Sequence, residues 1–128
     1  MKYGKLVAET KEHAFVTRII AQAGINKDAV YKASIKKLWD ELKTAVIYND
    51  ADVPKDVVRL NAEVTIQTPD NKQKQFKLVM PEKSNIAENK LSILAPMGLA
   101  LFGYAEGDEV LWQFPSGMSN IKIVKVDY

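Results

Sequence analysis

The chain has 128 residues, a net charge of +2, an apolar fraction of 47% and a charged fraction of 27%. This length and composition are typical of one globular domain, or of a small domain with an appendage. The absence of cysteine excludes disulfides and thiolate metal sites, and the small net charge does not indicate nucleic-acid binding. Residues 1–10 contain no long apolar segment, so neither a signal peptide nor a membrane anchor is expected there, and we predict a cytoplasmic location.

Two amphipathic helices are predicted in residues 1–49. The first covers residues 11–23 after the N-cap Thr10, with apolar positions at Phe15, Val16, Ile19, Ile20 and Ala23. The second follows the N-cap Asp28, with one apolar face made by Tyr31, Ile35, Leu38, Trp39, Leu42 and Val46. Because only a short connection separates them, we expect an antiparallel helical hairpin, a short coiled coil, with its tip at Asn26, Lys27 and Asp28.

A second part is predicted to begin at residue 50. Residues 49–55 are polar and contain Pro54, and beyond them apolar residues alternate with polar ones, as is typical of strands. The elements expected after this boundary are strands at 58–66 and 76–80 around a turn at 69–71, an apolar run at 91–96, a short helix at 97–102 closed by Gly103, a turn at 106–108 and strands near 110 and 121–126. The fold class is therefore α+β.

The residue types needed for catalysis are sparse. His13 is the only histidine, so the serines have no other histidine to act as their base, and a histidine metal cluster is excluded. Neither a phosphate-binding loop nor a dinucleotide fingerprint occurs. The neighbouring carboxylates are Asp40 with Glu41, Asp50 with Asp52, and Asp108 with Glu109, and we interpret them as a solvated helix face, a polar connection and a turn. We expect a protein that is not an enzyme and that has no cofactor.

Lysines gather on one side of the predicted hairpin. They are Lys27, Lys32, Lys36 and Lys37. Such a cluster is either a solvated helix face or a contact for an acidic surface or a phosphate backbone. The sequence leaves both readings open.

Several stretches together resemble the C-terminal domain of the Gre transcript-cleavage factors. They are residues 56–64 (DVVRLNAEV), 78–81 (LVMP), 91–103 (LSILAPMGLALFG), 107–110 (GDEV) and 115–117 (PSG). The sequence looks most like the related Rnk family, the regulator of nucleoside diphosphate kinase, which has the same Ala-Pro-x-Gly form and a shortened hairpin. The resemblance covers residues 50–128 in detail and residues 1–49 only as a pattern.

This resemblance implies an FKBP-like domain, in which a bent antiparallel sheet surrounds a short helix. The domain would dock on RNA polymerase near the mouth of the secondary channel, with the hairpin pointing towards that channel. In Gre factors, acidic residues at the hairpin tip help to hold a catalytic magnesium ion, which requires carboxylate oxygens. Here the tip offers Asp28 alone, beside Lys27 and Lys32. The resemblance therefore implies a polymerase-binding regulator without cleavage activity.

We expect the polymerase contacts in two segments. The candidate partner-binding residues are Ser92, Ala95, Pro96, Met97 and Gly98, together with the turn residues Ser116 and Gly117. For Pro96, Met97 and Gly98, a role in the interface and a role in keeping the fold are both open. Gre factors have acidic and hydroxyl residues just before this proline, whereas Leu94 and Ala95 stand here, so individual contacts do not carry over.

Two other functions stay open at this point. An FKBP-like fold is compatible with a peptidyl-prolyl isomerase or chaperone, whose aromatic-lined pocket would draw on Phe76, Tyr104, Trp112 and Phe114, although the same residues suit a packed sheet. A transcript-cleavage factor is the second. As partners we expect RNA polymerase, no membrane and no sequence-specific nucleic acid, with weak self-association through the hairpin as an open question.

Overall fold

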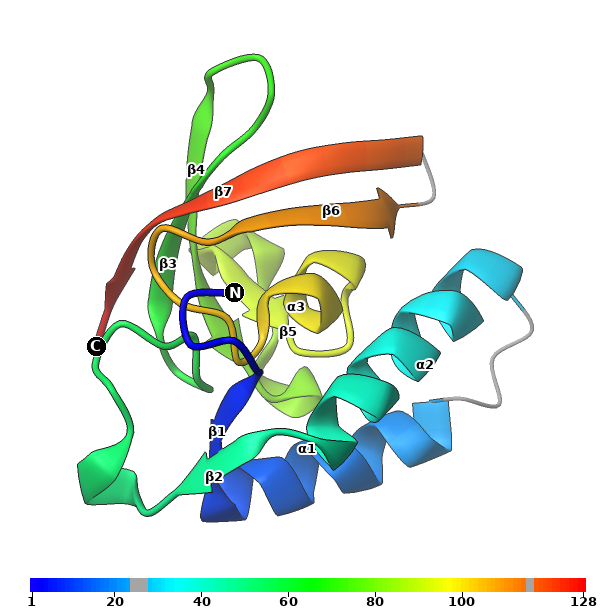
Figure 1. Cartoon of the computed structure of the whole chain (residues 1–128). Helices are drawn as coiled ribbons and strands as arrows, with labels where there is room; N and C mark the ends of the chain where they lie inside the picture. The colour runs from blue at the N-terminus through cyan, green and yellow to red at the C-terminus, as the bar shows by residue number, and fades with distance from the viewer. Residues whose placement is uncertain (24–27, 115–116) are drawn as a thin grey trace.

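The computed structural model describes residues 1–23, 28–114 and 117–128, and for residues 112–114 it describes the backbone alone. Two helices in contact, α1 (Thr10–Ala23) and α2 (Ala29–Lys43), run in opposite directions near the N-terminus (Figure 1). They are flanked by β1 (Val7–Glu9) and β2 (Val46–Tyr48), which pair in parallel. Asp28 caps α2 as predicted. The expected pair of helices is therefore confirmed, but Val46, which was expected on the apolar face of the second helix, lies in β2 because α2 ends at Lys43.

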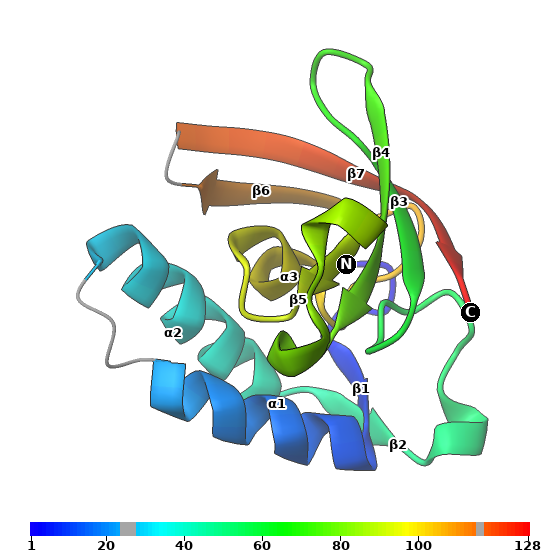
Figure 2. The same cartoon turned by 180° about the vertical axis from the view of Figure 1, so that it is seen from behind.

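The second part is a five-stranded sheet with the order β5-β4-β3-β7-β6. Its strands are β3 (Glu63–Gln67), β4 (Gln73–Val79), β5 (Lys90–Ser92), β6 (Glu109–Phe114) and β7 (Gly117–Asp127), and the short helix α3 (Pro96–Leu101) lies between β5 and β6 in the chain. The α+β fold is confirmed. In Figures 1 and 2, β3 and β4 run steeply across β6 and β7, and α3 lies beneath the strands.

Two details of the sheet differ from the sequence prediction. The sheet is mixed rather than antiparallel, because β5 pairs in parallel with β4. The chain reaches β5 by a crossover over residues 80–89 instead of a tight turn, and such a connection returns the next strand in the same direction. The strand expected over residues 58–66 begins only at Glu63, since Asn61 adopts a positive φ of 70° just before it.

One hydrophobic core joins the helical pair to the sheet. Its buried members include Val16 and Ile20 from α1, Ile35, Leu38 and Leu42 from α2, Val64, Ile66, Leu78, Ile121 and Ile123 from the sheet, and Leu99 and Leu101 from α3. The predicted boundary between residues 49 and 50 thus lies between two parts that share one core. A division into domains that fold separately stays a prediction.

Gly103 allows β1 to reach this core. It follows α3 with a positive φ of 83°, and a Cβ there would lie 2.3 Å from Cγ of Leu6. Its carbonyl oxygen accepts a hydrogen bond from Val7 N at 3.1 Å. Only glycine combines this backbone conformation with such a close approach.

Asp108 is more than the turn residue that was predicted. It is 8% exposed, and its carboxylate accepts hydrogen bonds from the backbone nitrogens of Ala105 at 2.8 Å and Lys2 at 2.6 Å. Two donors satisfy a carboxylate that burial would otherwise penalise. The side chain therefore holds the first residues of the chain against the turn.

An ion pair links α1 to the segment before β3. Glu12 Oε2 lies 2.9 Å from Arg59 Nε, and Glu12 Oε1 accepts a hydrogen bond from Leu60 N at 2.8 Å. Burial disfavours the charge on Arg59, but hydrogen bonds with Asp50 and Glu12 outweigh it and raise the pKa of the guanidinium. The Glu12 and Arg59 side chains are 13% and 18% exposed, so water screens this pair little.

A second polar link joins α2 to the residues after α3. The hydroxyl of Tyr104 donates a hydrogen bond to Glu41 and accepts one from Lys37 Nζ at 3.0 Å. The predicted solvated position of Glu41 is therefore wrong, because its side chain is 16% exposed and faces Tyr104. Burial and the hydrogen bond to Glu41 raise the pKa of Tyr104.

We predict that Glu12→Gln lowers the free energy of unfolding by about 2 kcal/mol, because it removes charge-assisted hydrogen bonds from a mostly buried arginine. Urea unfolding at neutral pH measures this. Asp50→Asn is the matched control, since Asp50 pairs with the same guanidinium at 2.8 Å but is 82% exposed. We expect it to cost less than about 1 kcal/mol. If both variants lowered the free energy of unfolding equally, the mostly buried Glu12 contact would not be the stronger of the two.

Alkaline pH should destabilise the fold through Tyr104. Its pKa in the folded state lies above the ordinary value of 10.0, so above that pH the unfolded chain releases a proton that the folded chain keeps. The stability difference between wild type and Tyr104→Phe should shrink by up to about 1.4 kcal/mol per pH unit above pH 10. Urea titrations between pH 8 and 11 test this, and parallel stability curves would refute it.

Candidate functional site

The segment from the end of β5 to the first turn of α3 holds most of the predicted partner-binding residues. We name residues 92–98 the α3 loop. Ser92, Ala95, Pro96 and Met97 are partly exposed, whereas Gly98 is buried. Ser92 organises the loop, because its Oγ accepts a hydrogen bond from Leu94 N at 3.0 Å and its carbonyl oxygen accepts one from Ala95 N at 3.0 Å.

Gly98 has a packing role. A Cβ at this position would lie 2.5 Å from the carbonyl oxygen of Ser92 and 2.9 Å from Cα of Ile93. Any side chain here would push α3 away from the segment that precedes it. The part of the α3 loop available to a partner is therefore made by Ala95, Pro96 and Met97.

Helix α2 lies against this loop. The hydroxyl of Tyr31 donates a hydrogen bond of 2.7 Å to the carbonyl oxygen of Leu94, although the two residues are 63 positions apart. A tyrosine hydroxyl is protonated at neutral pH and can donate, and burial raises the pKa of Tyr31 further above its ordinary value. Figures 1 and 2 show α2 alongside α3, and the two helices are in contact.

Sequence reasoning placed Tyr31 on the apolar face of its helix and missed this contact. A signal was present, since a buried tyrosine hydroxyl usually finds a hydrogen-bond partner. The sequence could not say which carbonyl accepts it.

The other predicted positions are described only in part. Gly117 begins β7 with a positive φ of 123° and lies opposite Phe114 in the register. Asp28 ends the connection between α1 and α2, and its Oδ1 accepts hydrogen bonds from Val30 N at 2.9 Å and Tyr31 N at 3.1 Å. Ser116, Asn26 and Lys27 lie outside the described residues.

The lysines on α2 do not form one uncompensated basic surface. Lys36 pairs with Asp40 at 2.7 Å and Lys37 with Glu41 at 3.1 Å, one helical turn further on in each case. This i,i+4 spacing brings oppositely charged side chains together on one face of a helix. Lys32 is exposed, and Lys27 is not described. Local pairing therefore accounts for two members of the cluster.

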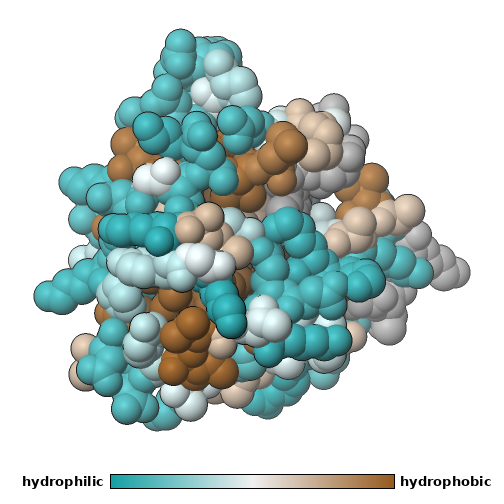
Figure 3. Space-filling view, in the orientation of Figure 1, coloured by the Kyte–Doolittle hydropathy of each residue, from teal (hydrophilic) through white to brown (hydrophobic). Residues whose placement is uncertain are grey.

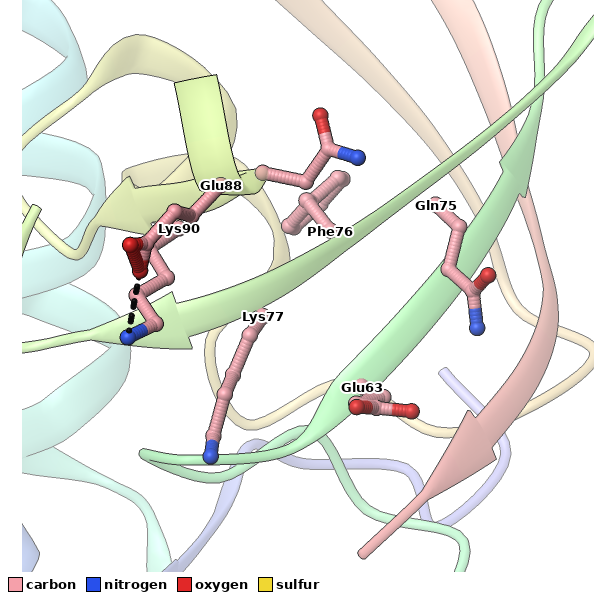
Figure 4. A pocket seen from close by; sticks show the side chains of 7 residues that line it. Glu63, Gln75, Phe76, Lys77, Glu88 and Lys90 are labelled. Carbon is pink, nitrogen blue, oxygen red and sulfur yellow. Dashed lines mark ion pairs between the residues drawn. The ribbon is translucent and has the colours of Figure 1, made fainter. Parts of the chain in front are cut away.

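The aromatic residues considered for an isomerase pocket do not converge where they are described. Tyr104 is buried beside Glu41, whereas Phe76 lies at the edge formed by β4 and β5. A hollow of about 320 Å³ at that edge is shown in Figure 4 and is lined by Glu63, Gln75, Phe76, Lys77, Glu88, Asn89 and Lys90. Phe76 is its one aromatic residue, and Glu88 and Lys90 pair at 3.0 Å. Its lining is largely polar, unlike an apolar proline pocket.

Three further features of the described part of the chain bear on its chemistry: the single histidine, possible metal ligands and possible membrane helices. His13 Nε2 lies 2.8 Å from the carbonyl oxygen of Leu42, so the histidine is partly buried between the two helices. Among the residues with described positions, no group of three or more His, Cys, Asp or Glu is arranged to hold a metal ion. None of the described helices is long and apolar enough to cross a membrane.

Exposed apolar side chains are dispersed over the surface. They include Phe15, Ile47, Tyr48, Ile86, Leu111 and Met118. The face in Figure 3 is mostly hydrophilic, with separate hydrophobic patches. Scattered apolar residues of this kind are normal in a folded protein, and they do not by themselves mark an interface.

Comparisons with known proteins identify the family. Residues 53–128 match the family described as "Transcription elongation factor, GreA/GreB, C-term". The transcription elongation factor GreA of Syntrophotalea carbinolica is 27% identical over 124 residues, which cover 95% of this chain and 78% of that protein. The regulator of nucleoside diphosphate kinase of Escherichia coli K12 is 31% identical over 90 residues, which cover 69% of this chain and 66% of that protein.

A solved structure agrees with this assignment. The prokaryotic transcription elongation factor GreA/GreB from Nitrosomonas europaea superposes with a TM-score of 0.75 at 27% identity, covering 97% of this chain and 98% of that one. Similarity extends to both kinds of relative, at comparable identity. The matched residues cover the sheet, α3 and the α3 loop, and the chain belongs to the GreA/GreB family of transcription elongation factors.

Proposed function

We propose that this protein binds RNA polymerase at the secondary channel and regulates transcription there without cleaving RNA. Membership of the GreA/GreB family supports the choice of partner. The chain is similar both to GreA and to a regulator of nucleoside diphosphate kinase, so the choice between a cleaving and a non-cleaving factor rests on the hairpin tip. The protein is then a non-catalytic factor that occupies the channel, closer in function to the Rnk relatives.

The role of Asp28 is the observation that carries this proposal. It is the only carboxylate in residues 24–32, and its Oδ1 accepts two backbone hydrogen bonds at the start of α2. A magnesium ion needs several oxygen ligands in octahedral geometry. One carboxylate engaged in helix capping and flanked by lysines does not fit that requirement, so no cleavage step is assigned to this tip.

The α3 loop is the proposed docking surface. Ala95, Pro96 and Met97 are partly exposed on a segment fixed at one end by Ile93 N, which donates to the carbonyl oxygen of Val79 at 2.9 Å, and at the other by α3. A rigid, partly apolar loop loses little entropy when it binds. Gly98 supports the surface from within, and Ser92 holds the loop conformation.

We predict that the protein co-purifies with core RNA polymerase and that Ala95→Arg weakens this binding at least about tenfold, because a long charged side chain would separate the docking surfaces. Biolayer interferometry with immobilised core enzyme measures the affinity. Gln73→Arg is the matched control, since Gln73 is exposed on β4 and the substitution adds the same charge. Failure of the folded wild-type protein to bind at low salt would remove the proposal, and equal weakening by both variants would remove the α3 loop as its site.

Transcript cleavage is the alternative activity, and it can be measured directly. We expect backtracked elongation complexes incubated with this protein and magnesium to keep full-length transcripts, because the tip offers a single carboxylate, Asp28, where a magnesium ion needs several oxygen ligands. A GreA protein serves as the positive control. Shortened transcripts above the intrinsic rate would contradict the proposal, and their loss in Asp28→Asn would then assign the activity to the tip carboxylate.

A further inference from the structure

We propose that Tyr31 is a positioning residue that holds the α3 loop in its polymerase-binding conformation from the helical pair. The hydroxyl of Tyr31 on α2 reaches the carbonyl oxygen of Leu94 in the centre of the loop. The inference rests on the proposed function, and it deepens it: α2 and the docking loop act as one binding unit rather than as two separate parts.

The hydrogen bonds within the loop hold the amides of residues 93–95, whereas the carbonyl oxygen of Leu94 is bonded by a residue outside the loop. Ile93 N is held by Val79, and Leu94 N and Ala95 N are both held by Ser92. These bonds secure the amides on the side of β5. The Leu94 carbonyl instead points to α2, where Tyr31 meets it at 2.7 Å.

Tyr31 is well suited to fix this carbonyl. Its ring is partly buried against the shared core, and a tyrosine side chain has only two rotatable torsions, so little freedom is lost in holding the bond. Its own backbone nitrogen donates to Asp28 at 3.1 Å, and the N-cap therefore fixes the helical turn that carries the ring. Hydrogen bonds therefore connect Asp28 to Tyr31 and Tyr31 to Leu94, which precedes Ala95.

Tyr104 provides a matched comparison. It also bridges α2 and the segment around α3 by its hydroxyl, through Lys37 and Glu41, but it lies after α3 and makes these bonds away from the loop. Replacing either tyrosine by phenylalanine removes one oxygen atom from the same interface. Only Tyr31→Phe removes a bond to the loop itself.

The first experiment measures amide hydrogen exchange by NMR in the free protein. The Ala95 amide, which donates to Ser92, reports on the loop. In Tyr31→Phe we expect it to exchange about three- to tenfold faster than in wild type, the range that loss of one hydrogen bond allows. In Tyr104→Phe we expect no change at Ala95. Unchanged exchange in Tyr31→Phe, or equal acceleration in both variants, overturns the inference whatever the protein binds.

The second experiment is a double-mutant cycle on polymerase affinity, with Tyr31→Phe, Met97→Ala and the combined variant. If Tyr31 positions the contact made by Met97, the two losses overlap, and the combined variant binds at least about threefold better than the product of the single factors predicts. The cycle of Tyr104→Phe with Met97→Ala should be multiplicative. Multiplicative behaviour in both cycles overturns the positioning role, whereas absence of wild-type binding removes the proposed function and leaves the exchange result standing.

Discussion

Burial of the apolar faces of α1 and α2 against the sheet and α3 is the constraint on which the structure depends. Neither helix is long enough to be stable in water by itself, so both need this tertiary contact. The sheet in turn leaves apolar residues facing α3 that the helices help to cover. Because core side chains interlock at high density, the position of α2 sets the position of α3. The polar links of Glu12, Glu41 and Tyr31 then select one arrangement of these elements.

Local patterns predicted most of the elements, and long-range contacts account for what they missed. The helical spacing of apolar residues and the cap at Asp28 depend on neighbours in the chain, and both are confirmed. The Glu41 side chain has a lysine at the ideal spacing, which hid its contact with a tyrosine 63 residues away. The parallel pairing of β5 could not be predicted either, because it depends on the path of a crossover and leaves no periodic trace in the sequence.

In the candidate site, too, local sequence patterns were predictable and long-range contacts were not. The sequence marked residues 92–98 as distinctive, and the structure explains part of that pattern through packing, since Gly98 has no room for a side chain. What distinguishes surface from core within this segment is the path of β5 and α2 around it, which no short motif encodes. A conspicuous motif in a fold of this kind combines residues that keep the backbone in place with residues that meet a partner.

The place of β7 in the sheet has a consequence for biosynthesis. Residues 117–127 lie between β3 and β6 and supply Ile121, Ile123 and Val126 to the core. While these residues are still inside the ribosome, β3 lacks a neighbour and β6 has none at all. Strands β3, β4 and β5 can pair earlier, but the sheet is complete only once β7 has been made. Until then the exposed edges of β3 and β6 are open to wrong pairing or to chaperones. The helical pair is synthesised before the sheet, but the complete sheet against which it packs is available only after β7 has been made.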